Sequence, residues 1–280
     1  MLQGDVLCYT LSKDQGVEQP KVKLLIVCPI PVEFNACREV LSLRDIQGSW
    51  ACRAGRRSSG NVEVYALESG PAKVRAAWAT TAGIQQLSPQ LVLDTGCCAG
   101  IRPGSAVGEI ILAKTCYEYD ISGGGFPKKS IREMRLPSAL QILEAASRQT
   151  LLRRAVEEGR QAGYEVRVGD QACGEFLIQS QAMRQALFAL FGAEAGNWET
   201  AGVFIPALKS ALPALSLRVV TDLGDENALR DFRRNAKEKS RQLYRCLQVL
   251  IETGWFALFM SGWEKLPEAS RRKLPSLVRP

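Results

Sequence analysis

Four short, largely apolar runs constrain the fold of this chain more than any other feature. They occupy residues 23–28, 91–95, 110–113 and 215–222. A run without alternating polar residues is typical of a strand that is buried on both faces, as in a sheet covered by helices. Helical patterns lie between these runs, at residues 32–41, 138–163, 180–191 and, after the last run, 228–252. This alternation predicts one α/β domain.

The last apolar run ends at Thr221 and Asp222, before a glycine-containing turn. Ligands of open α/β sheets bind at the carboxyl ends of the strands, so Asp222 is the first candidate for chemistry. Asp is also a favoured helix N-cap, and a helical stretch begins near Ala228. On this segment alone, both interpretations of Asp222 remain open.

Two other strand ends carry candidate residues. Glu33 falls in the first turn of a predicted helix after the first strand, where the positive helix terminus favours any carboxylate. The second run leads into Gly96-Cys97-Cys98-Ala99-Gly100, which predicts a loop of small residues whose amides can approach a ligand. A tight turn between two strands explains the same loop without a ligand.

The chain of 280 residues contains no histidine. This excludes a Ser-His-Asp triad, a Cys-His pair and a His-ligated metal, so proton transfer is left to Asp, Glu, Tyr, Cys and Lys. We expect no metal site and no cofactor. The net charge is +7, but Lys and Arg are scattered among acids, which predicts a solvated surface and no nucleic-acid partner.

The nine cysteines include no C-x-x-C pair, which favours free thiols in a reducing cytosol. The sequence shows no secretory signal pattern and no uncharged apolar run of the ~18 residues that a membrane span requires. We therefore expect a cytoplasmic protein without stable membrane insertion.

Composition predicts three parts: a polar extension at 1–21, the α/β domain at 22–252, and an aromatic and basic extension at 253–280. The segment 254–260 is predicted to cover an apolar patch of its own domain or of a partner subunit, with a membrane surface as the alternative.

Two further local predictions concern the domain itself. Gly123-Gly124-Gly125 predicts a mobile loop that could lie over a site. The helix after residue 71 is expected to use Val74 and Trp78 among its apolar positions.

The order of five motifs resembles the nucleoside phosphorylase superfamily, and within it the methylthioadenosine/S-adenosylhomocysteine nucleosidase branch. The motifs lie at residues 26–33, 68–74, 94–100, 196–201 and 218–222, and the likeness spans 22–252. It implies a single-domain three-layer α/β sandwich, in which helices flank a central mixed, twisted β-sheet. It also implies a homodimer or larger homo-oligomer with a small-molecule nucleoside as substrate.

The same resemblance implies hydrolysis of the N-glycosidic bond of a purine nucleoside, with adenine as the first choice of base and methylthioadenosine or S-adenosylhomocysteine as examples. Asp222 would protonate purine N7 or hold a proton near it, with Thr221 orienting its carboxyl group. Glu33 would activate water, and Glu199 would accept hydrogen bonds from the ribose and favour an oxocarbenium-like state. Further residues predicted to border the substrate are Trp198, Asn197, Phe176, Cys97, Cys98 and Gly96. For Trp198 and Phe176, ordinary core packing remains an equal alternative.

Departures from the family pattern leave the exact substrate open. Asn197 stands where the branch usually has Glu, Pro71-Ala72 replaces a glycine-containing turn, and Cys173-Gly174-Glu175 replaces Ser-Gly-Asp. The acid Glu33 lies where phosphorylases carry a phosphate-binding arginine stretch, which favours hydrolysis over phosphorolysis. Three alternatives stay open: a phosphate-dependent phosphorylase, a hydrolase of a larger adenosyl or modified-purine substrate such as a menaquinone or hopanoid precursor, and a non-catalytic nucleoside-binding protein.

Overall fold

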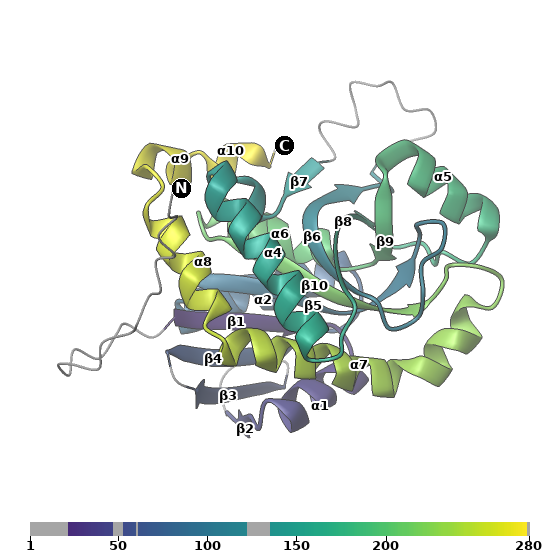
Figure 1. Ribbon diagram of the computed structural model, residues 1–280, viewed down its shortest axis with the longest axis horizontal. Helices are drawn as coiled ribbons and strands as arrows, with labels where there is room; N and C mark the ends of the chain where they lie inside the picture. The colour runs from purple at the N-terminus through teal and green to yellow at the C-terminus, as the bar shows by residue number, and fades with distance from the viewer. Residues whose placement is uncertain (1–21, 47–52, 60, 122–134, 279–280) are drawn as a thin grey trace, which may run out of the picture.

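The computed structural model describes residues 22–46, 53–59, 61–121 and 135–278. Figure 1 shows a central twisted sheet with helices on both faces. The strands are β1 Val22–Cys28, β2 Arg44–Asp45, β3 Ala54–Ser59, β4 Val62–Glu68, β5 Leu91–Gly100, β6 Ile110–Glu118, β7 Arg135–Pro137, β8 Val166–Cys173, β9 Ala193–Asn197 and β10 Ala214–Asp222. The helices are α1 Pro31–Val40, α2 Lys73–Leu87, α4 Ala145–Gln161, α5 Gln181–Phe191, α6 Thr200–Lys209, α7 Ala228–Glu252, α8 Trp255–Glu264, α9 Glu268–Arg272 and α10 Leu274–Leu277, with a 3-10 turn η1 at Ala139–Gln141.

The strand β5 is the centre of the sheet and is buried along its whole length. It pairs in parallel with β1 and β10 and antiparallel with β9, while β10 also pairs antiparallel with β6. Parallel and antiparallel neighbours therefore meet in one mixed sheet, which confirms the predicted fold class. Because β1, β5 and β10 run in the same direction, their carboxyl ends come together at one edge.

Two helix layers cover opposite faces of this sheet. Neighbouring residues of a strand point to opposite faces, so Asp94 and Thr95 of β5 mark the two sides. Asp94 accepts a hydrogen bond from Thr200 of α6 at 2.6 Å, while Thr95 bonds Tyr244 of α7 at 3.0 Å. The helix α2 packs with α6, and α1 packs with α7, which gives the three layers.

The predicted loop at residues 96–100 is wrong, since these residues form the second half of β5. They pair with β10 and, at their end, with β9. Small residues and glycines give little local strand signal, and it is the pairing with two neighbours that extends the strand. The strand β8 ends at Cys173, before Phe176.

The predicted apolar face of α2 is also wrong. The side chains of Val74 and Trp78 are 76% and 49% exposed, and the buried residues are Ala76, Ala79, Thr80 and Gly83. A Cβ atom at Gly83 would lie 2.8 Å from the side chains of both Leu25 and Leu67. The helix therefore turns its smallest residues to the sheet to allow this close approach.

The aromatic segment after α7 packs on its own chain. Trp255, Phe256, Phe259 and Trp263 of α8 are buried, and the Trp255 indole donates a hydrogen bond to the Leu151 carbonyl at 2.9 Å. This agrees with the interpretation that residues 254–260 cover an apolar patch of their own domain. No helix within the described ranges is long and apolar enough to span a membrane.

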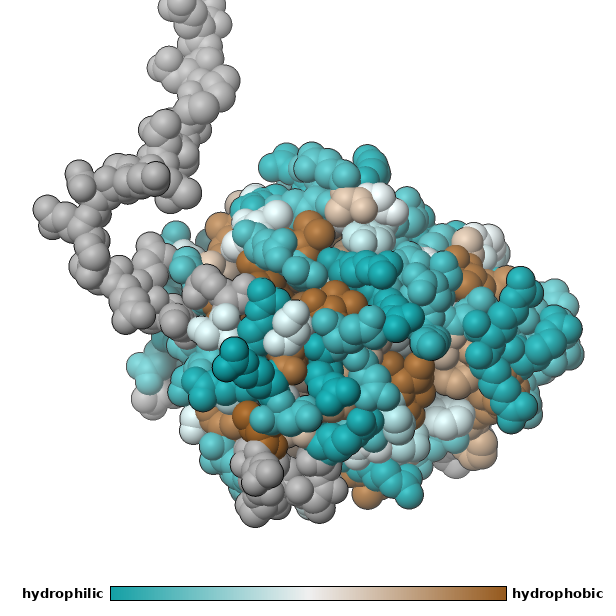
Figure 2. Space-filling view, turned by 90° about the horizontal axis from the view of Figure 1, so that it is seen from below, coloured by the Kyte–Doolittle hydropathy of each residue, from teal (hydrophilic) through white to brown (hydrophobic). Residues whose placement is uncertain are grey.

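The face seen in Figure 2 is mainly hydrophilic, with hydrophobic side chains in separate areas between the polar ones. This agrees with the predicted solvated surface. The predicted mobile loop at Gly123-Gly124-Gly125 and the extension at 1–21 lie outside the described residues.

Candidate active site

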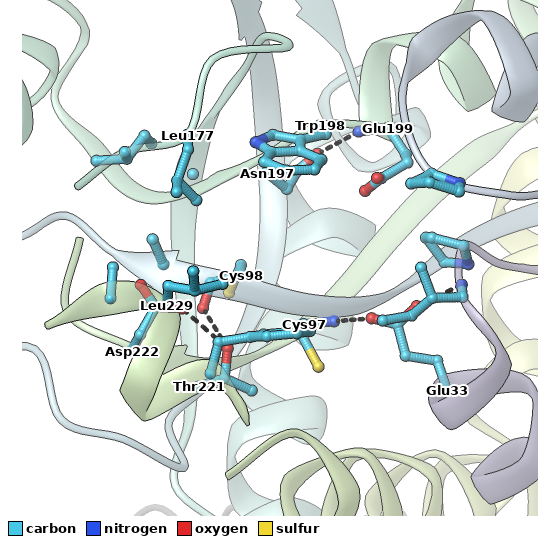
Figure 3. A pocket seen from close by; sticks show the side chains of 18 residues that line it. Glu33, Cys97, Cys98, Leu177, Asn197, Trp198, Glu199, Thr221, Asp222 and Leu229 are labelled. Carbon is cyan, nitrogen blue, oxygen red and sulfur yellow. Dashed lines mark hydrogen bonds between the residues drawn. The ribbon is translucent and has the colours of Figure 1, made fainter. Parts of the chain in front are cut away.

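A cavity of about 300 Å³ opens at the carboxyl ends of β1, β5 and β10. The segments that form the cavity are far apart in sequence. Figure 3 shows Trp198 and Glu199 facing Cys97 and Glu33 across it. Asp222 lies at the end of the cavity opposite to Glu33 and Glu199. The lining residues are Pro29, Ile30, Glu33, Pro71, Cys97, Cys98, Ala99, Leu177, Ile178, Gly196, Asn197, Trp198, Glu199, Thr221, Asp222, Ala228, Leu229 and Phe232.

Glu33 is held at both carboxylate oxygens. It is the third residue of α1, and its Oε2 accepts a hydrogen bond from the Ile30 amide at 3.1 Å, while Oε1 accepts one from the Cys97 amide at 2.7 Å. Gly96 makes room for this contact: its φ is +139°, and a Cβ there would lie 2.8 Å from Glu33 Oε1. Gly96 thus borders Glu33 but does not line the cavity itself.

Burial raises the pKa of Glu33 to about 7. The negative charge of Glu199 adds to this increase, whereas Arg218 and the two backbone amides oppose it. A carboxyl group with such a pKa exists in both protonation states near neutral pH. It can therefore accept or hold a proton under physiological conditions.

Glu199 stands opposite, at the start of α6. Its Oε1 accepts a hydrogen bond from the Ala72 amide at 3.1 Å, and its Oε2 lies 3.1 Å from the Arg218 guanidinium. Burial raises the pKa of Glu199, and the nearby Arg218 opposes this by favouring the carboxylate.

Arg218 organises the charges behind the cavity, although the sequence singled it out only as part of a motif. It is buried and binds both oxygens of Asp94, with Nε 2.8 Å from Oδ2 and Nη2 2.6 Å from Oδ1. Its Nη1 also donates to the Cys97 carbonyl at 2.9 Å. Asp94 is held in turn by the hydroxyls of Thr200 and Ser216. One guanidinium therefore joins β5, β10 and the Glu199 carboxylate.

Asp222 ends β10 and does not cap the following helix. The residue at the N-cap of α7 is Asn227, whereas Asp222 accepts hydrogen bonds from the Thr221 hydroxyl at 3.1 Å and the Gly224 amide at 3.0 Å. Burial raises the pKa of Asp222 to about 6, against the opposing effect of these two hydrogen bonds. The protonated form is therefore accessible near neutral pH.

The walls at the Asp222 end are apolar, and they include two residues that the sequence analysis missed. Leu177 and Ile178 line the cavity, whereas Phe176 does not: its side chain is 66% exposed, and its carbonyl accepts a hydrogen bond from the Tyr119 hydroxyl at 2.7 Å. This bond holds the backbone with Phe176 turned outward. The expectation that Phe176 flanks the substrate is not met here, whereas Trp198 does line the cavity.

Cys97 and Cys98 reach the cavity from β5, yet their main-chain groups are largely in use. The Cys97 amide binds Glu33, and the carbonyls of Cys97 and Cys98 accept hydrogen bonds from Arg218 and Thr221. Burial raises the pKa of both thiols well above the ordinary value, so neither supplies a thiolate nucleophile. Within the described ranges, no three His, Cys, Asp or Glu side chains are grouped to hold a metal ion.

A model of the phosphorylase superfamily matches residues 23–252. Among curated proteins, the chain is 27% identical over 244 residues to the ATP nucleosidase Cap17 of Escherichia coli (strain KTE188), which covers 76% of this chain and 48% of that protein. The chain thus spans about half the length of that relative. It is also 27% identical over 198 residues to the 5'-methylthioadenosine/S-adenosylhomocysteine nucleosidase of Listeria monocytogenes serotype 4b (strain F2365), covering 68% of this chain and 82% of the relative.

Solved structures share the fold at lower sequence identity. The futalosine hydrolase of Helicobacter pylori strain 26695 superposes with a TM-score of 0.70 at 19% identity, covering 83% of this chain and 98% of that one. The 5'-methylthioadenosine/S-adenosylhomocysteine nucleosidase of Helicobacter pylori gives a TM-score of 0.71 at 19% identity, covering 83% and 99%. Since the family model matches most of the chain, this protein belongs to the phosphorylase superfamily.

Proposed function

We propose that this protein hydrolyses the N-glycosidic bond of a purine nucleoside and releases adenine. The observation that carries the proposal is the convergence of three buried carboxyl groups, Glu33, Glu199 and Asp222, on one cavity. Burial raises the pKa of Glu33 to about 7 and that of Asp222 to about 6, so each can exchange a proton near neutral pH. The nucleosidase names among the relatives point to the same reaction.

The leaving base departs more readily when it is protonated. Asp222 lies among apolar side chains, with its carboxyl group oriented by Thr221 and Gly224, and it donates or holds the proton at purine N7. Its raised pKa suits this role, because an acid must keep its proton in the substrate complex. Leu177 and Ile178 form the apolar wall for the base.

The sugar lies between Glu199 and Glu33 as the bond breaks. Glu199 accepts hydrogen bonds from the ribose hydroxyls, and its negative charge stabilises the oxocarbenium-like state. Glu33, on the other side of the cavity, removes a proton from the attacking water. Arg218 favours the carboxylate form of Glu199, and the same guanidinium is also paired with Asp94.

Hydrolysis is favoured over phosphorolysis by the charges around the cavity. None of the described residues that line it is Lys or Arg, and the nearby Arg218 already binds Asp94, Glu199 and the Cys97 carbonyl. An incoming phosphate would meet Glu33 and Glu199 without a free cation to bind it.

The test is to incubate the protein with methylthioadenosine, S-adenosylhomocysteine, adenosine and inosine, with and without phosphate, and to separate the products by chromatography. We expect free adenine and the free sugar without phosphate. Release that requires phosphate and yields a sugar 1-phosphate supports the phosphorylase alternative. Binding without release from any nucleoside refutes the enzymatic proposal.

A second candidate substrate is an adenine nucleotide, as in the name of the relative ATP nucleosidase Cap17. Leu229 and Phe232 of α7 line the cavity, and Leu229 is 46% exposed, so this part of α7 forms the rim. Arg233 follows Phe232 and lies one helical turn beyond Leu229, which places it on the same side. Arg233 is exposed and makes no ion pair within the described part of the chain. A phosphate chain that leaves the cavity over this rim meets its guanidinium.

We also propose that the protein is a cytoplasmic homo-oligomer. Within the described ranges, seven cysteines are free and buried, which suits a reducing compartment.

Three exposed apolar side chains support the homo-oligomer: Val74 and Trp78, which lie one turn apart on α2, and Phe176. Glu175 ties the Phe176 segment to the start of α2, because its carboxylate accepts a hydrogen bond from the Lys73 amide. This exposed apolar cluster suits a subunit interface. Light scattering of the protein and of Trp78→Glu tests it, with a smaller assembly expected for the variant.

A further inference from the structure

Asn197 lies at the joint between β9 and α6 and is buried. Its side-chain Oδ1 accepts hydrogen bonds from the amides of Glu199 at 3.0 Å and Thr200 at 2.9 Å. Both amides belong to the start of α6, where backbone donors have no partner within the helix. An Asn side chain in this arrangement acts as a helix cap, although the residue before the helix is Glu199.

The remaining polar groups of Asn197 bind a different part of the site. The side-chain Nδ2 donates to Gln171 Oε1 of β8 at 3.2 Å, and the Asn197 carbonyl accepts from the Gly174 amide at 3.0 Å. Gly174 begins the segment that continues to Leu177 and Ile178 on the cavity wall. Asn197 therefore connects the start of α6 to the wall at the Asp222 end.

We infer that Asn197 is a positioning residue, which orients the first turn of α6 so that the Glu199 carboxylate faces the ribose hydroxyls. The role of Glu199 as ribose acceptor rests on the proposed function. Two amides occupy the Asn197 side-chain oxygen, and one of the two Nδ2 hydrogens is directed at Gln171. Little hydrogen-bonding capacity is left for a ligand, so Asn197 acts through Glu199.

The other groups that contact Glu199 cannot replace its hydrogen bond to Asn197. Ala72 and Arg218 contact the carboxylate, whereas Asn197 fixes the backbone that carries it. Without the Asn197 acceptor, the buried amides of Glu199 and Thr200 lose their partner, and a buried donor without a partner is costly. The turn must then rearrange to expose or re-pair these amides, and the carboxylate moves with it.

The test measures preference for ribose without requiring catalysis. The probes are a carbon-linked adenine nucleoside, whose base cannot be hydrolysed, and its 2′,3′-dideoxy form, titrated by calorimetry. We expect the wild type to bind the ribo form about tenfold tighter or more, because hydrogen bonds to a carboxylate are strong. Asn197→Ala should lose most of this preference and bind the dideoxy form as the wild type does.

Two further variants distinguish a positioning role of Asn197 from a general loss of structure. Asn197→Ser keeps a neutral acceptor that caps helices, and it should retain the preference. Asn197→Gln keeps the amide, but its extra methylene group moves the oxygen away, and it should lose the preference. If Asn197→Ala does not fold, as judged by circular dichroism, the Ser and Gln variants decide the matter.

A double substitution shows whether the effect passes through Glu199. In a Glu199→Gln background, adding Asn197→Ala should leave the remaining ribose preference unchanged. The inference is overturned if folded Asn197→Ala keeps the full preference, if it weakens both probes equally, or if the wild type shows no preference. A wild type that prefers the ribo probe but releases no base from nucleosides refutes the proposed catalysis alone.

Discussion

The Cys97 amide donates a hydrogen bond to Glu33 Oε1 over 2.7 Å, and this bond joins the middle of β5 to the first turn of α1. The two residues are separated by 64 positions in the sequence. The bond is short because the intervening Gly96 has no side chain and adopts φ +139°. The position of the proposed base therefore depends on a glycine that does not itself line the cavity.

Substitution of Gly96 should weaken the hydrogen bond between β5 and α1. In Gly96→Ala, the new Cβ would lie 2.8 Å from Glu33 Oε1 in a backbone conformation that disfavours L residues. We expect a loss of about 1 to 3 kcal/mol of stability and at least a tenfold loss of base release. Gly104→Ala is the matched control, because its φ is +76° and its nearest atom is 3.6 Å away, on Arg102. If both variants keep full activity, the Glu33 placement is not critical.

Glu33→Gln should lower the rate of base release and remove one pH-dependent contribution to stability. Burial raises the pKa of Glu33 from 4.5 to about 7, so the folded state binds a proton more tightly than the unfolded state does. This contribution to stability is complete below pH 4.5 and is lost as the pH rises through 7. At pH 8 the wild type carries the unfavourable buried charge, and the variant does not.

The amide nitrogen of Gln faces one of the two backbone N–H groups that bind Glu33, which costs stability at every pH. We therefore expect the stability of Glu33→Gln relative to the wild type to rise by about 1 to 3 kcal/mol between pH 4 and pH 8. Its base release should fall by a factor of about 10² to 10⁴, with nucleoside binding retained. Chemical denaturation at the two pH values gives the first result, and product assays give the second. Glu157→Gln, at an exposed position of α4, is the control and should change neither activity nor this pH dependence.

Asp222→Asn should abolish base release while nucleoside binding persists. The amide keeps an oxygen for the Gly224 amide but cannot donate a proton as an acid. With the proposed roles, kcat/KM of the wild type should require a protonated Asp222, with a pKa of about 6, and an ionised Glu33, with a pKa of about 7. The competent form is then most populated between these values, and the profile is bell-shaped with a maximum between pH 6 and 7. Unchanged turnover in Asp222→Asn excludes the acid role.

The layered fold and much of the cavity could be predicted from the sequence. Continuous apolar runs report burial on both faces of a sheet, so the strands around Ile26, Leu93 and Val219 were expected. Asp222 and Glu33 were predicted at strand and helix ends, and both line the cavity in the structure.

The partners of buried charges could not be predicted, because they come from distant segments. Arg218 lies in an apolar strand, and nothing local shows that it binds Asp94 and Glu199.

The sequence also could not predict that Leu177 lines the cavity and Phe176 does not, because the two residues are neighbours of similar hydrophobicity. The difference comes with the local backbone, in which the Phe176 carbonyl accepts a hydrogen bond from the Tyr119 hydroxyl. The helical spacing of Ala228 and Phe232 is a signal that could have identified that part of the wall.

Ala72 is expected to be a strained residue whose replacement by glycine stabilises the protein. Its φ of 79° and ψ of 159° are almost restricted to glycine, yet its amide holds Glu199 Oε1 at 3.1 Å. Ala72→Gly should raise the free energy of unfolding by about 1 kcal/mol, since relief of strain exceeds the added flexibility of the unfolded chain. Ala77→Gly, inside α2, is the control and should lower it by about 1 kcal/mol. Equal destabilisation by both contradicts the strain.

Substitution of Arg233 tests whether the substrate is a nucleoside or a nucleotide. It follows the cavity residue Phe232 and lies one helical turn beyond Leu229. Within the described ranges it makes no ion pair, whereas its neighbour Arg230 lies 3.2 Å from Asp231. If the substrate carries 5′-phosphates, Arg233→Ala should lower kcat/KM for ATP by about tenfold, since a hydrogen bond to a charged group contributes about 1.5 to 3 kcal/mol. Activity on adenosine should not change. Arg230→Ala is the control and should leave both activities near the wild-type level. Steady-state base release from ATP and adenosine measures these effects, and equal losses for the two substrates, or no release from ATP by the wild type, exclude the nucleotide.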